Sequence, residues 1–180
     1  MEIKDKKLSK FKKIIRYLYP TYIYENVESI PYELIKNENI KLIILDMDNT
    51  LVDNKQIFSK QLKQWSINMQ KNNIELYILS NCPYGKIVKK VAQKLKMKYQ
   101  YNASKPFLKG FIKIMDTTKI QRENILMVGD QLFTDIFGGN RFGVKTILVR
   151  PINKKEVFIT KLKRPFEKMI LNHLYKKGEL

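Results

Sequence analysis

The chain alternates short apolar runs with longer amphipathic stretches, and this alternation limits its fold more than any other feature of the sequence. Strand-like runs separated by helix-like segments are typical of a parallel α/β sheet, because parallel neighbours need a long crossover connection. We expect strands at residues 41–45, 75–79, 97–101, 124–128 and 145–149. The sequence therefore predicts an α/β, Rossmann-like fold with a five-stranded parallel sheet and helices on both faces.

Amphipathic segments that fit helices lie between these runs. They cover residues near 59–71, 84–96, 106–115 and 134–141. Ser59 is a suitable N-cap for the first helix, and Pro106 fits the first turn of the third. With the flanks included, we divide the chain into a basic amphipathic N-terminal segment (1–40), an α/β core (41–150) and a basic helical tail that packs on the core (151–180).

Polar side chains follow four of the five predicted strands. In an open parallel sheet the carboxyl ends of the strands are where ligands bind, so these side chains should meet at one edge. Clustered carboxylates need a cation, and hard oxygen ligands suit Mg²⁺. A phosphate that bridges the metal and a lysine would satisfy both charges, which indicates a metal-dependent phosphoryl-transfer site. The residues concerned are Asp46 and Asp48, Ser80 and Asn81, Lys105, and Asp130 and Asp135.

Four motifs in the range 41–150 resemble those of the haloacid dehalogenase superfamily. "DMDNT" at 46–50 matches D-x-D-x-T, Ser80 in "ILSN" stands where that family has Ser or Thr, Lys105 in "SKP" matches its lysine, and "GDQLFTD" at 129–135 matches its acidic motif. All four occur in the family's order. The chain is most similar to the YqeG-type branch, related to phosphatidylglycerophosphate phosphatases, through "LDMDNTLV", "GDQLFTDIFGGNRFG" and "TKLKRPFEK".

The resemblance implies a phosphomonoester hydrolase that works through an aspartyl-phosphate. Asp46 would be the nucleophile. Asp48 would protonate the leaving oxygen and later activate water. The phosphoryl oxygens would be bound by Ser80, Asn81 and Lys105.

The resemblance also implies the metal site. Mg²⁺ would be held by the Asp46 carboxylate, the backbone carbonyl of Asp48 and the Asp130 carboxylate, with Asp135 supporting its water shell. A calcium loop of the EF-hand type is a poorer interpretation of "DMDNTLVDN", because Leu51 and Ile57 stand where that loop needs Gly and Glu.

The spacing of the motifs leaves no room for a cap domain. The intervals 53–74 and 82–104 each fit one helix with a loop or a short strand. A capless site is open, so a large substrate could reach it.

The formal net charge of +18, from 35 Lys and Arg against 17 Asp and Glu, predicts attraction to polyanions. An AT-rich genome would account for part of the lysine content. The partners that fit are a phosphate-ester substrate, anionic phospholipid at a membrane surface and, with less support, nucleic acid. Leu8, Phe11, Ile14, Ile15 and Leu18 share a helical face that would lie in a membrane interface or pack on the sheet.

No apolar run approaches the roughly 20 residues that cross a bilayer, and residues 1–13 lack the apolar region of a signal peptide. We therefore expect a cytoplasmic protein, with peripheral contact at the inner face of the membrane as an option. Two functional classes stay open: a Mg²⁺-dependent phosphatase of a lipid, a soluble ester or a nucleic-acid end, and a non-catalytic nucleic-acid or ribosome-binding module. The sequence does not fix the oligomeric state.

Overall fold

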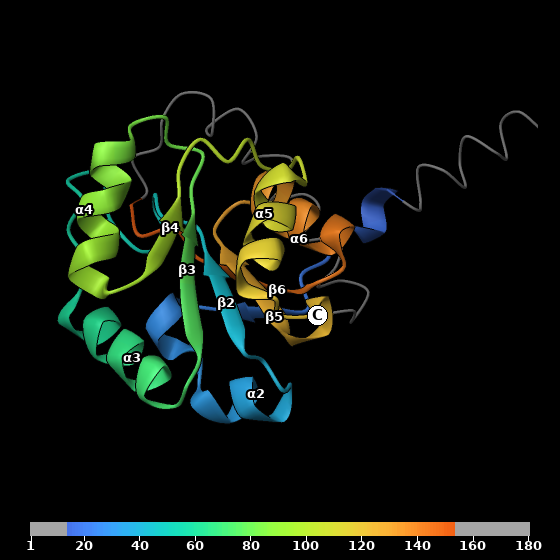
Figure 1. Ribbon diagram of the computed structural model, residues 1–180, viewed down its shortest axis with the longest axis horizontal. Coiled ribbons are helices and arrows are strands. Elements are labelled where there is room, and N and C mark those ends of the chain that lie inside the picture. The colour runs from blue at the N-terminus through green and yellow to red at the C-terminus, as the bar shows by residue number, and fades with distance from the viewer. Residues whose placement is uncertain (1–13, 154–180) are drawn as a thin grey trace, which may run out of the picture.

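The computed structural model describes residues 14–153, which fold around one parallel sheet of six strands (Figure 1). The order across the sheet is β1-β6-β5-β2-β3-β4, and every neighbouring pair is parallel. The strands are β1 (Tyr22–Tyr24), β2 (Leu42–Leu45), β3 (Glu75–Leu79), β4 (Lys98–Gln100), β5 (Ile125–Gly129) and β6 (Lys145–Val149). The predicted α/β fold class is confirmed.

The sixth strand, β1, is the difference from the five that the sequence predicts. It is only three residues long, and its YIY sequence contains no apolar run. β1 forms because it can pair with the exposed edge of β6, with Tyr22 opposite Ile147. Just before the strand, the Thr21 N–H donates to the Thr146 carbonyl at 2.9 Å. This pairing is a long-range contact, so the local sequence does not predict it.

Five α-helices and three short helical turns connect the described strands. The Ser59 prediction is confirmed, because its hydroxyl accepts from the Leu62 N–H at 2.9 Å and caps α3. The α-helices are α2 (Tyr32–Asn37), α3 (Lys60–Lys71), α4 (Gly85–Leu95), α5 (Lys109–Thr118) and α6 (Phe137–Phe142). The turns are η1 (Val27–Ser29) and η2 (Arg122–Asn124), which are 3₁₀, and η3 (Leu132–Ile136), which is π-helical.

Two predicted helix boundaries are wrong. The helix expected from Pro106 begins at Lys109, because the chain first makes a turn in which the Phe107 N–H donates to the Ser104 carbonyl at 2.9 Å. The helix expected at 134–141 divides into η3 and α6. A π-helical turn widens the spiral at the place where Asp135 must reach the sheet, and such turns are frequent at functional sites.

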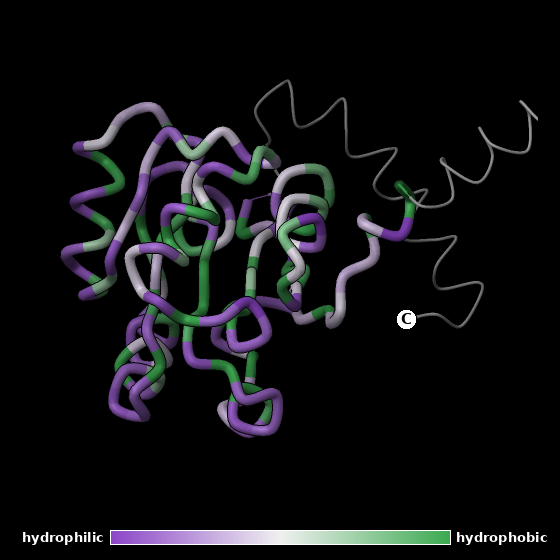
Figure 2. Tube along the Cα trace, turned by 45° about the vertical axis from the view of Figure 1, so that its right-hand side comes forward, coloured by the Kyte–Doolittle hydropathy of each residue, from purple (hydrophilic) through white to green (hydrophobic). Residues whose placement is uncertain are grey.

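Helices cover both faces of the sheet, and successive strand residues point to opposite sides. Ile43 and Leu45 pack with the residues of α3 and α4, whereas Leu42 and Ile44 pack with those of α5 and α6. Figure 2 shows hydrophilic and hydrophobic residues alternating along the coils, as expected of helices with one buried face. The strands are buried on both faces, as expected of a parallel sheet.

The intervals in which a cap domain would be inserted contain none within residues 14–153. Between β2 and β3 the chain has a loop and α3, and between β3 and β4 it has α4. Of the helices in this range, none is long and apolar enough to cross a membrane.

The flanking segments fall partly outside the described residues. Residues 22–40, assigned from the sequence to the N-terminal segment, contain β1, η1 and α2. Leu18 is buried against Leu132 and Leu148, whereas Ile14 is exposed. Leu8, Phe11 and the tail at 154–180 lie outside the described residues, so the proposed division of the chain stays a prediction.

Candidate active site

The turn after β2 gives Asp46 and Asp48 different surroundings. The Asp46 N–H continues the sheet by donating to the Val128 carbonyl at 2.9 Å. Beyond it, the N–H groups of Leu51 and Val52 both donate to the Met47 carbonyl, which closes a tight turn. As a result Asp46 is buried at the end of the sheet, and Asp48 is exposed to solvent. Partial desolvation nevertheless raises the pKa of Asp48, against the attraction of Lys105.

Three carboxylates converge where β2 and β5 end. Asp46 follows β2, Asp130 follows β5, and Asp135 lies in η3. One oxygen from each lies within 4.8 Å of the others, and all three residues are buried. β2 and β5 are neighbours in the sheet, although their paired residues Leu45 and Val128 are 83 positions apart in the sequence. Only folding therefore brings these carboxylate oxygens together.

Lys105 is the counter-charge of this cluster. Its Nζ lies 2.6 Å from Asp46 Oδ1 and 2.8 Å from Asp135 Oδ1, and its side chain is 1% exposed. Burial alone would lower the pKa of the Lys105 ammonium, but the two carboxylates raise it above its ordinary value. The lysine is therefore charged at neutral pH.

The donor set fits a hard divalent cation. Three buried carboxylates face one ammonium, so the cluster keeps an excess of negative charge when all its groups are ionised. Burial raises the pKa of Asp46 to about 7 against the pull of Lys105, with the charge of Asp135 adding to the rise. A bound cation would offset this cost, and oxygen ligands alone favour Mg²⁺.

Ser80 and Asn81 follow β3, beside β2. The buried Ser80 hydroxyl accepts from the Cys82 N–H at 3.0 Å, which leaves its hydrogen able to donate to an anion. The Asn81 amide is engaged differently from the sequence expectation. Its Oδ1 accepts from the Lys105 N–H at 2.7 Å, and its Nδ2 donates to the Lys105 carbonyl at 3.1 Å. Asn81 thus holds the main chain of Lys105 with both polar atoms of its side chain.

Two supporting residues were missed in the sequence. Thr50 is buried, with its hydroxyl 3.4 Å from Asp130 Oδ1. Gly129 lies so close to Asp135 that a Cβ at that position would come within 2.3 Å of its carboxylate. Both stand inside the quoted motifs, so the signal was present, but motif matching gives no reason for either residue.

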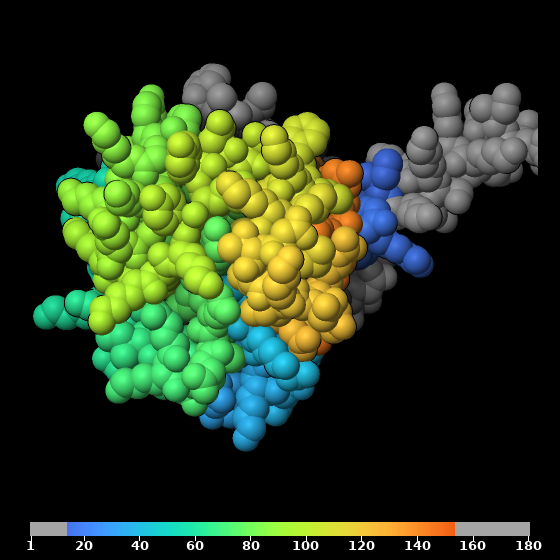
Figure 3. Space-filling view, in the orientation of Figure 1, coloured from blue at the N-terminus to red at the C-terminus, as the bar shows by residue number. Residues whose placement is uncertain are grey.

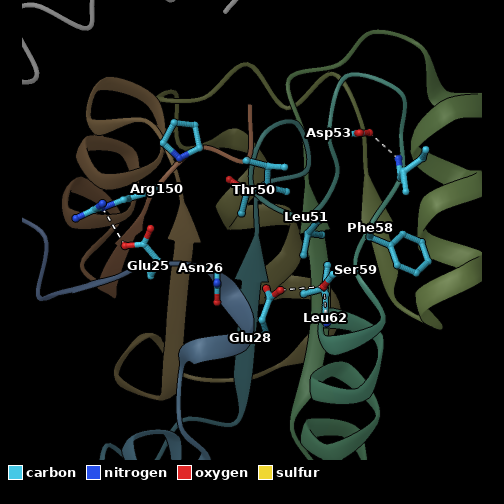
Figure 4. Close-up of a pocket in the computed structure, with 13 residues that line it drawn as sticks. Glu25, Asn26, Glu28, Thr50, Leu51, Asp53, Phe58, Ser59, Leu62 and Arg150 are labelled. Carbon is cyan, nitrogen blue, oxygen red and sulfur yellow. Dashed lines mark hydrogen bonds and ion pairs between the residues drawn. The ribbon is translucent and has the colours of Figure 1, made fainter. Parts of the chain in front are cut away.

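A cavity of about 420 Å³ opens beside this site (Figure 4). Thr50, Leu51 and Asp53 from the turn after β2 line one side of it. Glu25 and Arg150, paired at 3.0 Å, line another. The cavity, with both polar and apolar residues in its lining, provides space for a group larger than phosphate next to the carboxylate cluster.

The chain is similar in sequence to known phosphatases. A family model for mitochondrial PGP phosphatase matches residues 6–153. The probable phosphatase YqeG of Bacillus subtilis (strain 168) is 35% identical over 166 residues, which are 92% of this chain and 96% of the relative. Phosphatidylglycerophosphate phosphatase 1, chloroplastic/mitochondrial, of Arabidopsis thaliana is 42% identical over 55 residues, 30% of this chain and 16% of the relative.

Among solved structures, a crystal structure of an uncharacterized protein from Listeria monocytogenes serotype 4b has a TM-score of 0.54 at 20% identity. The match covers 66% of this chain and 85% of that one. At this level of identity the likeness concerns the fold.

Proposed function

Given that the chain belongs to the mitochondrial PGP phosphatase family, within the haloacid dehalogenase phosphatases, we propose that it hydrolyses a lipid-borne phosphomonoester through an aspartyl-phosphate on Asp46. The observation that carries this proposal is the pairing of a buried lysine with Asp46 and Asp135 beside Asp130. In this arrangement a nucleophile, a phosphate-binding cation and a set of metal ligands lie together.

The first step forms the phosphoenzyme. An Asp46 carboxylate oxygen attacks phosphorus, the bond from phosphorus to the ester oxygen breaks, and Asp48 donates a proton to the departing alcohol. Asp48 suits this task because its side chain is exposed at the mouth of the site, on the same turn as Asp46.

The second step releases phosphate. Asp48, now ionised, takes a proton from water, and the oxygen of that water attacks phosphorus and breaks its bond to Asp46. Lys105 and the Ser80 hydroxyl would hold the phosphoryl oxygens during both steps. Lys105 also prevents repulsion between the Asp46 carboxylate and the incoming dianion.

Mg²⁺ would be held by Asp46 and Asp130, with the Asp48 carbonyl and Asp135 in support, and would supply neutralisation of phosphoryl charge. Since Asp135 also pairs with Lys105 at 2.8 Å, we propose that it links the metal to the lysine.

Phosphatidylglycerophosphate is the proposed substrate. The family match and the short similarity to the Arabidopsis enzyme support a lipid phosphate. The open site supports it too, because acyl chains can stay in the bilayer while the headgroup enters. The cavity beside Thr50 offers room for the glycerol portion. A soluble phosphate ester is the alternative that turnover must decide.

The test measures phosphate release from phosphatidylglycerophosphate in mixed micelles, from a soluble phosphosugar and from a nucleoside monophosphate. We expect Mg²⁺-dependent release that is fastest for the lipid. Asp46→Asn should abolish turnover and keep the fold, because an amide of nearly the same shape cannot form the acyl phosphate.

Undiminished turnover in a chelator would disprove the metal requirement. Turnover by Asp46→Asn would place the nucleophile elsewhere. Efficient cleavage of a soluble ester with no cleavage of the lipid would replace the substrate proposal with that of a general phosphatase.

A further inference from the structure

Residues 76–115 carry charged side chains of one sign only. This segment contains nine lysines and no aspartate or glutamate. It includes most of β3, α4, β4 and most of α5, and Figure 3 shows it, in green to yellow, over much of the upper face in view. Eight of its lysines are exposed, and the ninth is the buried Lys105.

Exposed aromatic side chains occupy the loops of this segment at the carboxyl edge of the sheet. Tyr84 is 67% exposed, Tyr101 48% and Phe107 68%. Tyr84 precedes α4, Tyr101 follows β4, and Phe107 precedes α5. Large apolar side chains that gather on one surface mark an interaction site more often than single exposed ones do.

The loops that carry these side chains are joined into one surface. The Asn102 N–H donates to the Cys82 carbonyl, and the Ala103 N–H donates to the Ser80 carbonyl, each at 3.0 Å. The Tyr101 ring lies against Gly85, so closely that a Cβ there would meet the ring at 2.9 Å. The aromatic surface is therefore fixed relative to the same loops that position Lys105.

An apolar groove of about 510 Å³ continues this surface on the other side of Lys105. Pro106 and Phe133 line it together with Ile14 and Phe137. Most of its lining is aliphatic or aromatic, and Lys105 also belongs to it. Such a groove suits a hydrocarbon chain whose headgroup phosphate is at the lysine.

We propose that the carboxyl-edge loops at 80–86 and 101–109 are the surface by which the protein docks on an anionic lipid bilayer. Tyr84, Tyr101 and Phe107 enter the interface, and Lys86 and Lys109, at the starts of α4 and α5, contact lipid headgroups. The inference rests on the proposed function in one respect, which is that Lys105 binds the substrate phosphate. Docking in this orientation would present lipid-borne phosphate directly to Lys105.

Charge asymmetry fixes the orientation. The opposite side of the site, around the cavity of Figure 4, carries Glu28 and Asp53, which an anionic surface repels, and Glu25, whose charge Arg150 balances at 3.0 Å. Nucleic acid would also be attracted by the lysines. A bilayer is the better occupant, because the apolar groove and the exposed Phe107 can contact acyl chains. The charged phosphodiester backbone of a nucleic acid offers them no apolar partner.

The test measures co-sedimentation with vesicles of phosphatidylcholine containing about one third phosphatidylglycerol. Replacing Phe107 and Tyr84 together by serine should weaken binding roughly tenfold, because interfacial burial of two rings is lost. Lys86→Gln with Lys109→Gln should weaken it about fivefold per charge. The matched control is Lys41→Gln with Lys71→Gln, two exposed lysines at the amino edge, which should bind as the unmodified protein does.

Two further measurements separate this inference from the proposed function. Turnover of a soluble phosphomonoester reports on the chemistry alone, and the serine variant should retain it to within about twofold while losing turnover of vesicle-borne lipid phosphate. Vesicle binding reports on docking alone, so it can succeed even if no substrate is hydrolysed. Vesicle binding that is equal in all variants overturns the docking surface. Binding of a single-stranded RNA oligonucleotide that depends on the same residues, with no vesicle binding, overturns the bilayer as its occupant.

Discussion

Asn81 shows how one side chain can connect two parts of the proposed phosphate site. Its amide makes reciprocal hydrogen bonds with the main chain of Lys105, at 2.7 and 3.1 Å. The lysine must reach both Asp46 and Asp135 from its loop, so a small displacement of that loop would break two ion pairs. The sequence placed Asn81 beside the phosphate, and the structure indicates a positioning function.

We predict that Asn81→Ala lowers kcat tenfold or more, because a misplacement of a catalytic group by about 1 Å can cost that much or more. Its effect on KM should be smaller if the side chain acts through Lys105. Steady-state kinetics on a soluble ester would measure both constants. Asn37→Ala, at an exposed position of α2, is the control and should leave both unchanged. A rise in KM at constant kcat would instead support direct phosphate binding by Asn81.

At the scale of elements, the end of β5 and the turn η3 can pack closely because a glycine lies at their contact. Gly129 is the last residue of β5, and the Asp135 carboxylate packs against its backbone. The Asp135 Oδ2 also accepts from the Gln131 N–H at 3.1 Å, which holds the carboxylate over the strand. The strand and the π-helical turn therefore set the direction of Asp135 jointly.

Gly129→Ala should push Asp135 away from Lys105, because the added Cβ would lie 2.3 Å from its carboxylate. We expect turnover to fall at least roughly tenfold. Unfolding experiments should show a loss of about 1–3 kcal/mol in the free energy of unfolding. Ile35→Val, at the buried residue of α2, is a control for destabilisation: it should cost about 1 kcal/mol and keep turnover. Wild-type activity in Gly129→Ala would show that η3 can shift without harm.

At the scale of the whole molecule, the site joins strands that lie at the centre of the sheet. β2 leads to β3 and β4 on one side, and the chain then returns to β5 and β6 on the other side of β2. Asp46 and Asp130 follow the two strands at this reversal, where ligands bind in open parallel sheets. A cation held between them would connect both halves of the sheet.

Mg²⁺ should therefore raise the melting temperature of the whole domain, because the native state binds it and the unfolded chain does not. At a concentration of 100 Kd the gain is about 2.7 kcal/mol, or roughly 5–10 °C for a chain of this size. Differential scanning fluorimetry with and without Mg²⁺ would measure the shift. Asp130→Asn should remove it, whereas Asp116→Asn, an exposed aspartate of α5, should not. An equal shift in both variants would mean that Mg²⁺ binds elsewhere.

The sequence by itself determined the fold class, the strands β2 to β6 and most of the residues that meet at the site. Buried parallel strands leave continuous apolar runs, and the polar residues after β2, β3 and β5 stand directly beyond such runs. These signals are local, so they can be recognised in the sequence without the structure. The family resemblance added roles for them, and the family and its phosphatase activity are confirmed by the comparisons.

Only the tertiary structure decided how these residues meet. Lys105 and Asp46 are 59 positions apart and meet at 2.6 Å, while Asn81 binds the lysine's main chain at 2.7 Å. β1 exists because β6 offers it an edge, and helix α5 starts late because the Lys105 loop must turn first. The Lys105–Asp46 contact and the pairing of β1 with β6 join segments distant in the chain, and their free energy is gained only when the strand order brings both partners together.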